Sequence, residues 1–208
     1  MLNKLGIVVG SNTKAGNIFN SLFPSFLDIK YKTPSEYVSI YWNKYKESSN
    51  TNNNINGKVF EYILATLCVR ESILPLYMSA NVAFVPNVVY DLMFYSKEVG
   101  PICWSVKTSL RERYKQADLE SIVLKNVHRK ALSYLLTLEE KEAESVKKKI
   151  KTGDVIGLDN VIVATSEEFD ILIKNMKEFE FETPPTIQAI KSNQIITHAK
   201  AKMILNLQ

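Results

Sequence analysis

The sequence has few of the residues that mark secreted or membrane-spanning proteins. Its two cysteines, Cys68 and Cys103, both lie in apolar runs. Free thiols buried in a core are typical of reducing compartments, so we predict reduced cysteines in a cytoplasmic protein, with a disulfide as the alternative. No apolar run approaches the roughly 18 residues of a membrane span. The N-terminal segment MLNKLGIVVGSN is too weakly apolar for a signal peptide, so no membrane partner is expected.

Patterns of several catalytic centres are also missing. The glycines Gly6, Gly10 and Gly16 are not followed by Gly-Lys-Ser/Thr, so they do not form a phosphate-binding loop. The histidines His128 and His198 have no second ligand at metal-binding spacing. No histidine is paired with a cysteine in a recognisable catalytic pattern. These absences disfavour a nucleotide-binding loop, a histidine metal centre and a thiol nucleophile.

The composition otherwise predicts one globular domain whose positive charge is unevenly placed. A chain of 208 residues with 46% hydrophobic and 23% charged residues is long enough to bury a full core. Between Lys107 and Ala131 there are seven basic and three acidic residues, which accounts for the whole net charge of +4. A polyanionic partner would require basic charge gathered in this way. On charge alone, a solvated helix face is the simpler interpretation.

The stretch 91–120 predicts a β-hairpin that leads into a helix. The strands are expected over 88–95 and 102–107, with a turn at 96–100. The helix is expected from about residue 109 to residue 132 and carries most of the basic charge. This hairpin is the centre of the predicted site, because polar and charged residues interrupt its otherwise apolar strands.

Three charged side chains of this hairpin and helix are predicted to converge. With the turn centred near Glu98, Asp91 pairs opposite Ser105 and lies diagonal to Lys107, and such side chains are roughly 5 to 8 Å apart on one sheet face. On the helix, the i, i+3, i+7 spacing places three residues on one stripe, namely Arg113, Gln116 and Glu120. Two carboxylates and a lysine at the end of a hairpin suit a divalent metal that holds a phosphodiester.

The remaining pattern predicts an α/β (α+β) fold with a mixed central β-sheet flanked by helices. A hairpin followed by two strand–helix–strand crossovers requires both antiparallel and parallel pairs. Residues 73–85 carry too little pattern for an element. Helices are expected at 15–22, 34–47, 58–72 with Asn56 as its cap, 139–151 and 166–179, strands at 133–138 and 160–165, and a polar loop at 48–57.

Glu61 stands in the largely apolar helix predicted over 58–72. Its neighbours at helical spacing form a core stripe, so the simpler interpretation places Glu61 at the edge of that stripe. The alternative is that Glu61 points toward Asp91 and Lys107 as an extra ligand or an orienting group.

These residues resemble the PD-(D/E)XK nuclease pattern, which has an Asp, a Lys at a strand end and a preceding helix with a Glu. The segment KTSLRERYKQ, which begins at Lys107 and is followed by Glu120, resembles the active-site segment of EcoRII-type restriction endonuclease catalytic domains. Two positions depart from the family. Tyr90 precedes Asp91 where the family has Pro, and Ser105 stands where many members carry Asp or Glu.

A carboxylate elsewhere in the sequence can replace the one that is missing at Ser105. In several restriction enzymes the acidic residue has moved to the following helix, and Glu120 lies 13 residues after Lys107, at a suitable distance. Glu112 is a weaker candidate because it falls one turn too early and off the stripe of Arg113.

The resemblance implies a restriction-endonuclease-like fold and a Mg²⁺-dependent endonuclease for double-stranded DNA. Expected is a type II restriction enzyme that acts as a homodimer in the cytoplasm of a bacterium or archaeon. The alternatives are a structure-specific repair or junction nuclease of the same fold and an inactive DNA-binding module. The expected domain is 1–208, with an N-terminal helical part at 1–57, a catalytic core at 58–138 and a C-terminal α/β part at 139–208.

The resemblance also implies roles for single residues. Asp91 and Glu120 would bind the metal, while Lys107 would hold or help to deprotonate the attacking water and offset negative charge. Glu61 would be a further catalytic residue. Contacts with phosphate are expected from Ser105, Arg111, Arg113 and Gln116, with a structural brace to a carboxylate as the alternative for Arg113.

Overall fold

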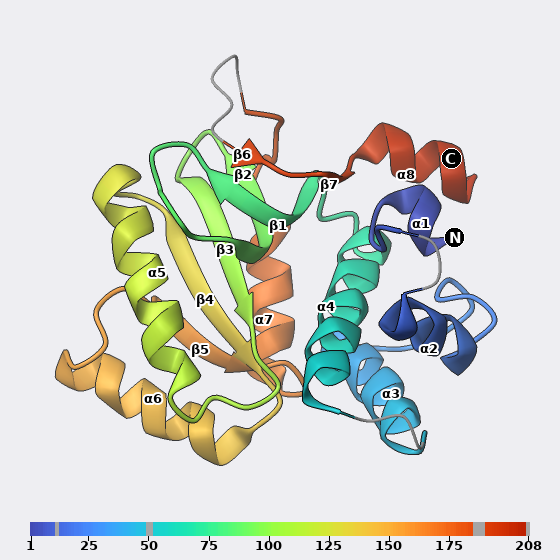
Figure 1. The fold of residues 1–208 in the computed structure, drawn as a ribbon, viewed down its shortest axis with the longest axis horizontal. Helices are drawn as coiled ribbons and strands as arrows, with labels where there is room; N and C mark the ends of the chain where they lie inside the picture. Colours follow the sequence, from blue (N-terminus) through green and yellow to red (C-terminus); the bar gives the residue numbers. More distant parts are fainter. Residues whose placement is uncertain (11–12, 49–51, 185–189, 207–208) are drawn as a thin grey trace.

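A mixed β-sheet lies between two layers of helices in the computed structural model, which describes residues 1–10, 13–48, 52–184 and 190–206 (Figure 1). Within these residues the strand order is β5-β4-β3-β2-β1-β6, and β7 also pairs with β1. The pairs among β1, β2 and β3 are antiparallel, whereas β3–β4 and β4–β5 are parallel. The strands are β1 Leu76–Val82, β2 Tyr90–Ser96, β3 Gly100–Val106, β4 Leu132–Thr137, β5 Asn160–Val163, β6 Ile190–Lys191 and β7 Gln194–Ile196.

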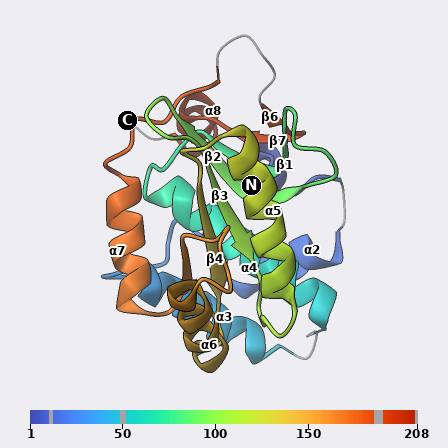
Figure 2. The ribbon, with the colours of Figure 1, turned by 90° about the vertical axis from the view of Figure 1, so that its left-hand side faces the viewer.

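Each face of the sheet is covered by its own helices. The face that carries Leu92, Phe94 and Trp104 packs into the main core with α4 and α7, and α1, α2 and α3 cover the outer side of α4 (Figure 1). Figure 2 looks onto the opposite face, which α5 and α6 cover. The helices are α1 Leu2–Leu5, α2 Lys14–Leu22, α3 Pro34–Lys46, α4 Asn53–Arg70, α5 Arg113–Val127, α6 Glu140–Thr152, α7 Glu167–Met176 and α8 His198–Leu205.

Local sequence signals explain several helix ends. The Thr33 side chain accepts the Glu36 N–H at the start of α3, and Pro34 fills the first helical position, where no N–H is needed. Helix α6 ends at Gly153, which has a left-handed backbone with φ of 81°. Both cysteines are buried and free, as predicted. Within the described residues, no helix is both long and apolar enough to span a bilayer.

The predicted fold class is confirmed, as are the hairpin and most of the elements. The helices predicted at 15–22, 34–47, 139–151 and 166–179 correspond to α2, α3, α6 and α7, with shifted ends. The strands predicted at 133–138 and 160–165 correspond to β4 and β5. Because β3–β4 and β4–β5 are the two parallel pairs, the crossover reasoning correctly gives a mixed sheet.

Four predictions about elements are wrong. The helix at 109–132 is shorter, because 107–112 form a loop and residue 132 already begins β4. The polar loop at 48–57 runs only to Asn52, which caps α4 by accepting the Ile55 N–H, while 49–51 lie outside the described residues. Asn56 is therefore not the cap, and it accepts a hydrogen bond from the Tyr45 hydroxyl instead. The segment 73–85, for which no element was expected, contains β1.

Candidate active site

The centre of the candidate site is an ion pair between β2 and the end of β3. Because Leu92 pairs with Trp104, Asp91 stands opposite Ser105, the register expected from the sequence. Asp91 Oδ2 accepts the Lys107 Nζ–H at 2.7 Å and the Val106 backbone N–H at 2.7 Å. The side chains of Asp91 and Lys107 are 20% and 19% exposed, so the pair is partly desolvated and still accessible. Ser105 itself is buried.

Helix α5 brings Glu120 to the same site. The stripe predicted on this helix is present, because the Gln116 side chain donates to Glu120 Oε1 at 2.8 Å. Burial raises the pKa of Glu120, and the nearby Asp91 carboxylate raises it further, while Gln116 and Lys107 oppose the shift. Asp91, Lys107 and Glu120 are therefore close enough to influence one another electrostatically.

Helix α4, which covers the face of the sheet opposite to α5, contributes a buried acidic residue. Glu61 is only 6% exposed, so it is not at the solvent edge of the apolar stripe. Its carboxylate forms an ion pair with Lys58 one turn earlier, at 2.7 Å. Burial raises the pKa of Glu61 to about 7, and the Asp91 carboxylate adds to the shift, whereas Lys58 and Lys107 lower it. A carboxyl with such a pKa is typical of functional sites.

The loop between β3 and α5 and the first residue of α5 each present an exposed basic side chain. Arg111 and Arg113 are exposed, and neither forms an ion pair within the described part of the chain. Arg111 has a left-handed backbone with φ of 37°, a conformation that is uncommon for residues other than glycine and that gathers at functional sites. The loop is anchored because Glu142 Oε2 of α6 accepts the Leu110 N–H at 2.5 Å.

Glu112 is separated from the other acidic residues. It is the residue before the first turn of α5, its side chain is 77% exposed, and it pairs with Lys115. This pairing lowers the pKa of Glu112, in contrast to the raised values of Glu61 and Glu120. The geometry therefore agrees with the preference for Glu120 over Glu112.

Two residues of the site were not selected from the sequence. Lys58 is the ion-pair partner of Glu61, and its i, i+3 spacing to that residue is a signal that would have identified it. Tyr90 donates its hydroxyl hydrogen bond to the backbone carbonyl of Glu120 at 3.0 Å. No sequence pattern predicts this contact, because it joins β2 to α5 across 30 residues.

The donors present suit a divalent ion with few protein ligands. Among the described residues, no three His, Cys, Asp or Glu side chains gather closely enough to enclose a metal. Mg²⁺ usually keeps several waters and binds through one or two carboxylates together with substrate phosphates. Both hydrogen bonds to Asp91 within the described chain go to Oδ2, which leaves Oδ1 for a ligand. Asp91 and Glu120 therefore form an open pair of carboxylates of the kind that suits Mg²⁺ with its bound waters.

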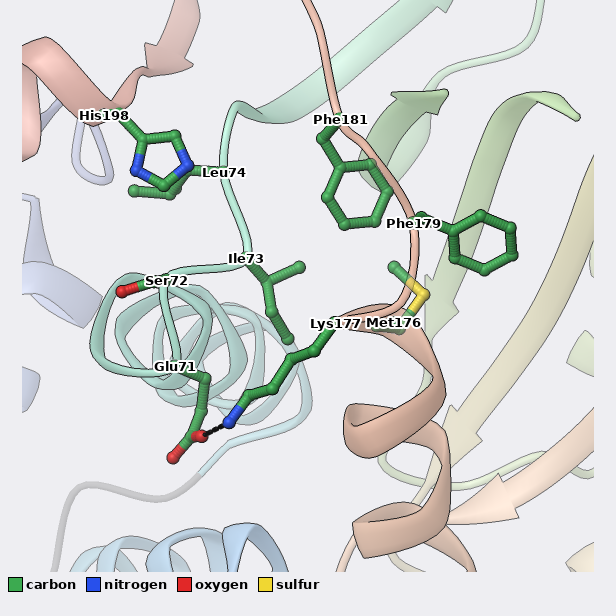
Figure 3. A pocket seen from close by; sticks show the side chains of 9 residues that line it. All are labelled: Glu71, Ser72, Ile73, Leu74, Met176, Lys177, Phe179, Phe181 and His198. Atoms are coloured by element: carbon green, nitrogen blue, oxygen red, sulfur yellow. Dashed lines mark hydrogen bonds and ion pairs between the residues drawn. The ribbon is translucent and has the colours of Figure 1, made fainter. Parts of the chain in front are cut away.

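A separate hollow of about 280 Å³ lies where α4, α7 and α8 meet (Figure 3). The ion pair between Glu71 and Lys177 crosses its edge, and Phe179, Phe181 and His198 contribute to its wall. None of the residues predicted for the site lines this hollow, so it belongs to a different part of the molecule.

The fold is similar to that of solved restriction endonucleases, although no family model and no curated protein matches the sequence. A restriction endonuclease PspGI–substrate DNA complex aligns with a TM-score of 0.58 and 16% identity, over 92% of this chain and 87% of that one. Metal-depleted Ecl18kI with uncleaved DNA aligns at a TM-score of 0.42 and 20% identity, over 69% and 51% of the two chains. The PspGI alignment spans nearly the whole chain, so this protein has a restriction-endonuclease-like fold.

Proposed function

We propose that this protein is a Mg²⁺-dependent endonuclease that hydrolyses phosphodiester bonds in double-stranded DNA. The similar PspGI structure is described as a restriction endonuclease with substrate DNA, which supports a sequence-specific type II enzyme. We also propose that it acts in the cytoplasm as a homodimer, since two symmetric active sites can cut the two strands of a palindromic site.

One observation carries the proposal, which is the excess of carboxylate around a single aspartate–lysine pair. Glu61 and Glu120 each interact electrostatically with Asp91, but only two lysines, Lys107 and Lys58, balance the three carboxylates within the described residues. Carboxylates in a partly buried site destabilise one another unless a cation joins them. Burial raises the pKa values of both glutamates and the Asp91 carboxylate raises them further, and a divalent ion would remove this repulsion.

The roles of the residues follow from their positions. Asp91 and Glu120 would hold the ion, which supplies charge neutralisation at the phosphate and favours deprotonation of a nearby water. The Lys107 ammonium, fixed by Asp91 at 2.7 Å, would orient the attacking water and offset negative charge as the phosphorus gains a fifth oxygen. Gln116 holds Glu120 by a hydrogen bond of 2.8 Å, so it would orient this ligand rather than contact phosphate.

The phosphate contacts would come from the loop before α5 and from the first residue of α5. Arg111 and Arg113 are exposed and follow Lys107 by a few residues in the sequence, so their guanidinium groups would bind phosphates of the DNA backbone. Ser105 is buried opposite Asp91, and its hydroxyl would act close to the scissile phosphate. Glu61 with Lys58 would form the third side of the site.

The direct experiment is incubation of the purified protein with a long duplex DNA, with and without Mg²⁺. Discrete fragments of reproducible size, lost when EDTA is added, are expected for a sequence-specific endonuclease. Sequencing of the fragment ends then gives the recognition site. The matched control is Asp159→Ala, because Asp159 also pairs with a lysine but is not among the predicted site residues.

Other outcomes separate the remaining functions. Cleavage only of branched or damaged duplexes would replace the restriction enzyme by a structure-specific nuclease. Binding of duplex DNA without cleavage in Mg²⁺, Mn²⁺ or Ca²⁺ would indicate an inactive DNA-binding module. Neither binding nor cleavage across a set of duplexes of varied sequence would overturn the proposal.

A further inference from the structure

We infer that Tyr90 is a positioning residue that sets the distance between the two proposed metal ligands. The inference rests on the proposed function, because it concerns the ion held by Asp91 and Glu120. Tyr90 immediately precedes Asp91 on β2, and its hydroxyl donates to the backbone carbonyl of Glu120 at 3.0 Å. A single side chain thus joins the backbone next to one ligand with the backbone of the other.

The tyrosine is placed rigidly enough for this role. It is 2% exposed and packs in a core cluster that includes Met93 of the same strand, Cys103 of β3 and Leu124 of α5. A buried ring surrounded on several sides has few alternative rotamers, so its hydroxyl remains at a fixed height above the sheet.

Helix α5 has few other polar contacts that could fix its position. The residue before its first turn, Glu112, provides no side-chain cap. Asp118 accepts the Gly157 N–H at 2.6 Å, and Lys125 pairs with Asp159 at 2.8 Å, so both of these contacts reach the segment before β5. Within the described chain, the hydrogen bond of Tyr90 is the one that ties α5 to the strand of Asp91.

A metal bound through two carboxylates from different elements is sensitive to their separation. Mg²⁺ requires near-ideal octahedral geometry with ligand distances of roughly 2.0 to 2.1 Å. A small displacement of α5 along β2 would therefore weaken the binding of the ion before it affected the packing of the core. The Tyr90 hydroxyl resists this displacement, while Gln116 controls only the side-chain orientation of Glu120.

The test is Tyr90→Phe, which keeps the ring and removes the hydrogen bond. We expect weaker binding of Mn²⁺, measured by electron paramagnetic resonance of the free ion, by about three- to tenfold, as for one lost neutral hydrogen bond. The Mg²⁺ concentration that gives half-maximal cleavage should rise by the same factor, while the rate at saturating Mg²⁺ stays within about twofold of the parent.

The matched control is Tyr37→Phe. Tyr37 is fully buried and donates to the Thr66 hydroxyl at 2.9 Å, in the helical layer between α3 and α4. Both variants lose one buried hydrogen bond, so their melting temperatures should fall by similar amounts. Only Tyr90→Phe should change the metal dependence, whereas a purely structural role for Tyr90 predicts unchanged Mn²⁺ affinity in both variants.

The outcomes separate this inference from the proposed function. Equal Mn²⁺ affinity of the parent and Tyr90→Phe would overturn the inference even if the parent cleaves DNA. A parent that binds Mn²⁺ through Asp91, as judged by loss of binding in Asp91→Ala, but cleaves no duplex would overturn the proposed function alone. The role of Tyr90 would then be decided by the affinity ratio. A parent that binds no Mn²⁺ would overturn both.

Discussion

Two aspartate–lysine pairs in this protein have nearly the same local geometry but very different surroundings. Asp91 Oδ2 accepts Lys107 Nζ–H and a backbone N–H of β3, each at 2.7 Å. Asp159 Oδ2 pairs with Lys125 Nζ at 2.8 Å and accepts the Ser133 N–H at 2.6 Å. Their aspartate side chains are 20% and 31% exposed. The pair geometry alone does not distinguish a catalytic centre from a structural brace.

The neighbouring carboxylates make the difference. Asp159 lines a hollow with Glu144 and Glu168, and both of these glutamates pair with Lys147. Lys151 lines the same hollow, so together with Lys125 three lysines accompany three carboxylates. Near Asp91, by contrast, Glu120 is held only by the Gln116 amide within the described residues. Burial raises the pKa values of Glu61 and Glu120, and the Asp91 carboxylate raises both further. Negative charge that the protein leaves unbalanced indicates a cation site near Asp91. Matched substitutions in the Asp91–Lys107 and Asp159–Lys125 pairs test this interpretation.

The largest difference is expected from removing either member of each pair. Asp91→Ala and Lys107→Ala should each lower the rate of DNA cleavage by at least about 10²- to 10³-fold, because each removes charge stabilisation at the reacting phosphate. Asp159→Ala and Lys125→Ala should leave the rate within about threefold of the parent, since surface substitutions away from the site have small effects. Initial rates on a plasmid substrate measure both.

Duplex binding distinguishes a chemical defect from a folding defect in these variants. Gel shifts in Ca²⁺ should show that Asp91→Ala and Lys107→Ala bind DNA about as tightly as the parent. Comparable losses of cleavage in the Asp159 and Asp91 variants would mean that the two pairs are equivalent, and the site would have to be sought elsewhere.

The second comparison is between Glu120, in the middle of α5, and Glu112, the residue before its first turn. Glu120→Gln should lower cleavage by about 10- to 100-fold, because metal ligands and their supporting groups contribute on this scale. Glu112→Gln should have little effect, since Glu112 is 77% exposed and pairs with Lys115. Excess Mn²⁺ should partly restore Glu120→Gln. A larger defect in Glu112→Gln than in Glu120→Gln would identify Glu112 as the second metal ligand.

A stability measurement probes the unbalanced charge directly through Glu61. The folded-state pKa is about 7, above the ordinary value of 4.5, so ionisation of this carboxyl opposes folding. The stability contribution of the neutral acid is fully present below about pH 4.5 and is lost as the pH rises through 7. Glu61→Gln does not titrate, so at pH 8 without metal it should be more stable than the parent by about 1 to 2 kcal/mol.

Urea unfolding at pH 5 and pH 8 tests this expectation. The advantage of Glu61→Gln should be small at pH 5 and grow toward pH 8, reduced by the loss of the Lys58 partner. A difference between parent and variant that is the same at both pH values would show that Glu61 ionises normally. In saturating Mg²⁺ the advantage should shrink, because the ion favours the carboxylate.

The site could be predicted from the sequence to the extent that its contacts are local or set by strand register. Asp91, Lys107 and Ser105 lie within one hairpin, so a turn near Glu98 and strict alternation were enough to place them. Glu120 and Gln116 followed from helical spacing, even though the predicted start of the helix was wrong, because a shift of the first turn leaves their relative positions unchanged.

The contacts that could not be predicted join elements distant in the sequence. Whether Glu61 faced solvent or Asp91 depended on how α4 packs on the sheet, and only the three-dimensional structure shows that it is buried. Strand β1 was missed because LYMSANV does not alternate and follows a proline, and its partners, β2 and β7, provide the missing information. The hydrogen bond from Tyr90 to Glu120 could not be predicted either, because it joins residues 30 positions apart.

The smallest expected effect compares the energies of the two pairs themselves. A double-mutant cycle with Asp159→Ala and Lys125→Ala should give a coupling of about 0.5 to 1 kcal/mol in urea unfolding, because both side chains are partly exposed. The cycle with Asp91→Ala and Lys107→Ala should give a similar value in EDTA, since the distances match. In Mg²⁺ the two cycles should diverge, because an ion bound to Asp91 shares its charge and weakens the coupling to Lys107. Coupling at Asp159 that is equally sensitive to Mg²⁺ would mean that the ion binds both pairs, and the contrast in surrounding carboxylates would then lose its meaning.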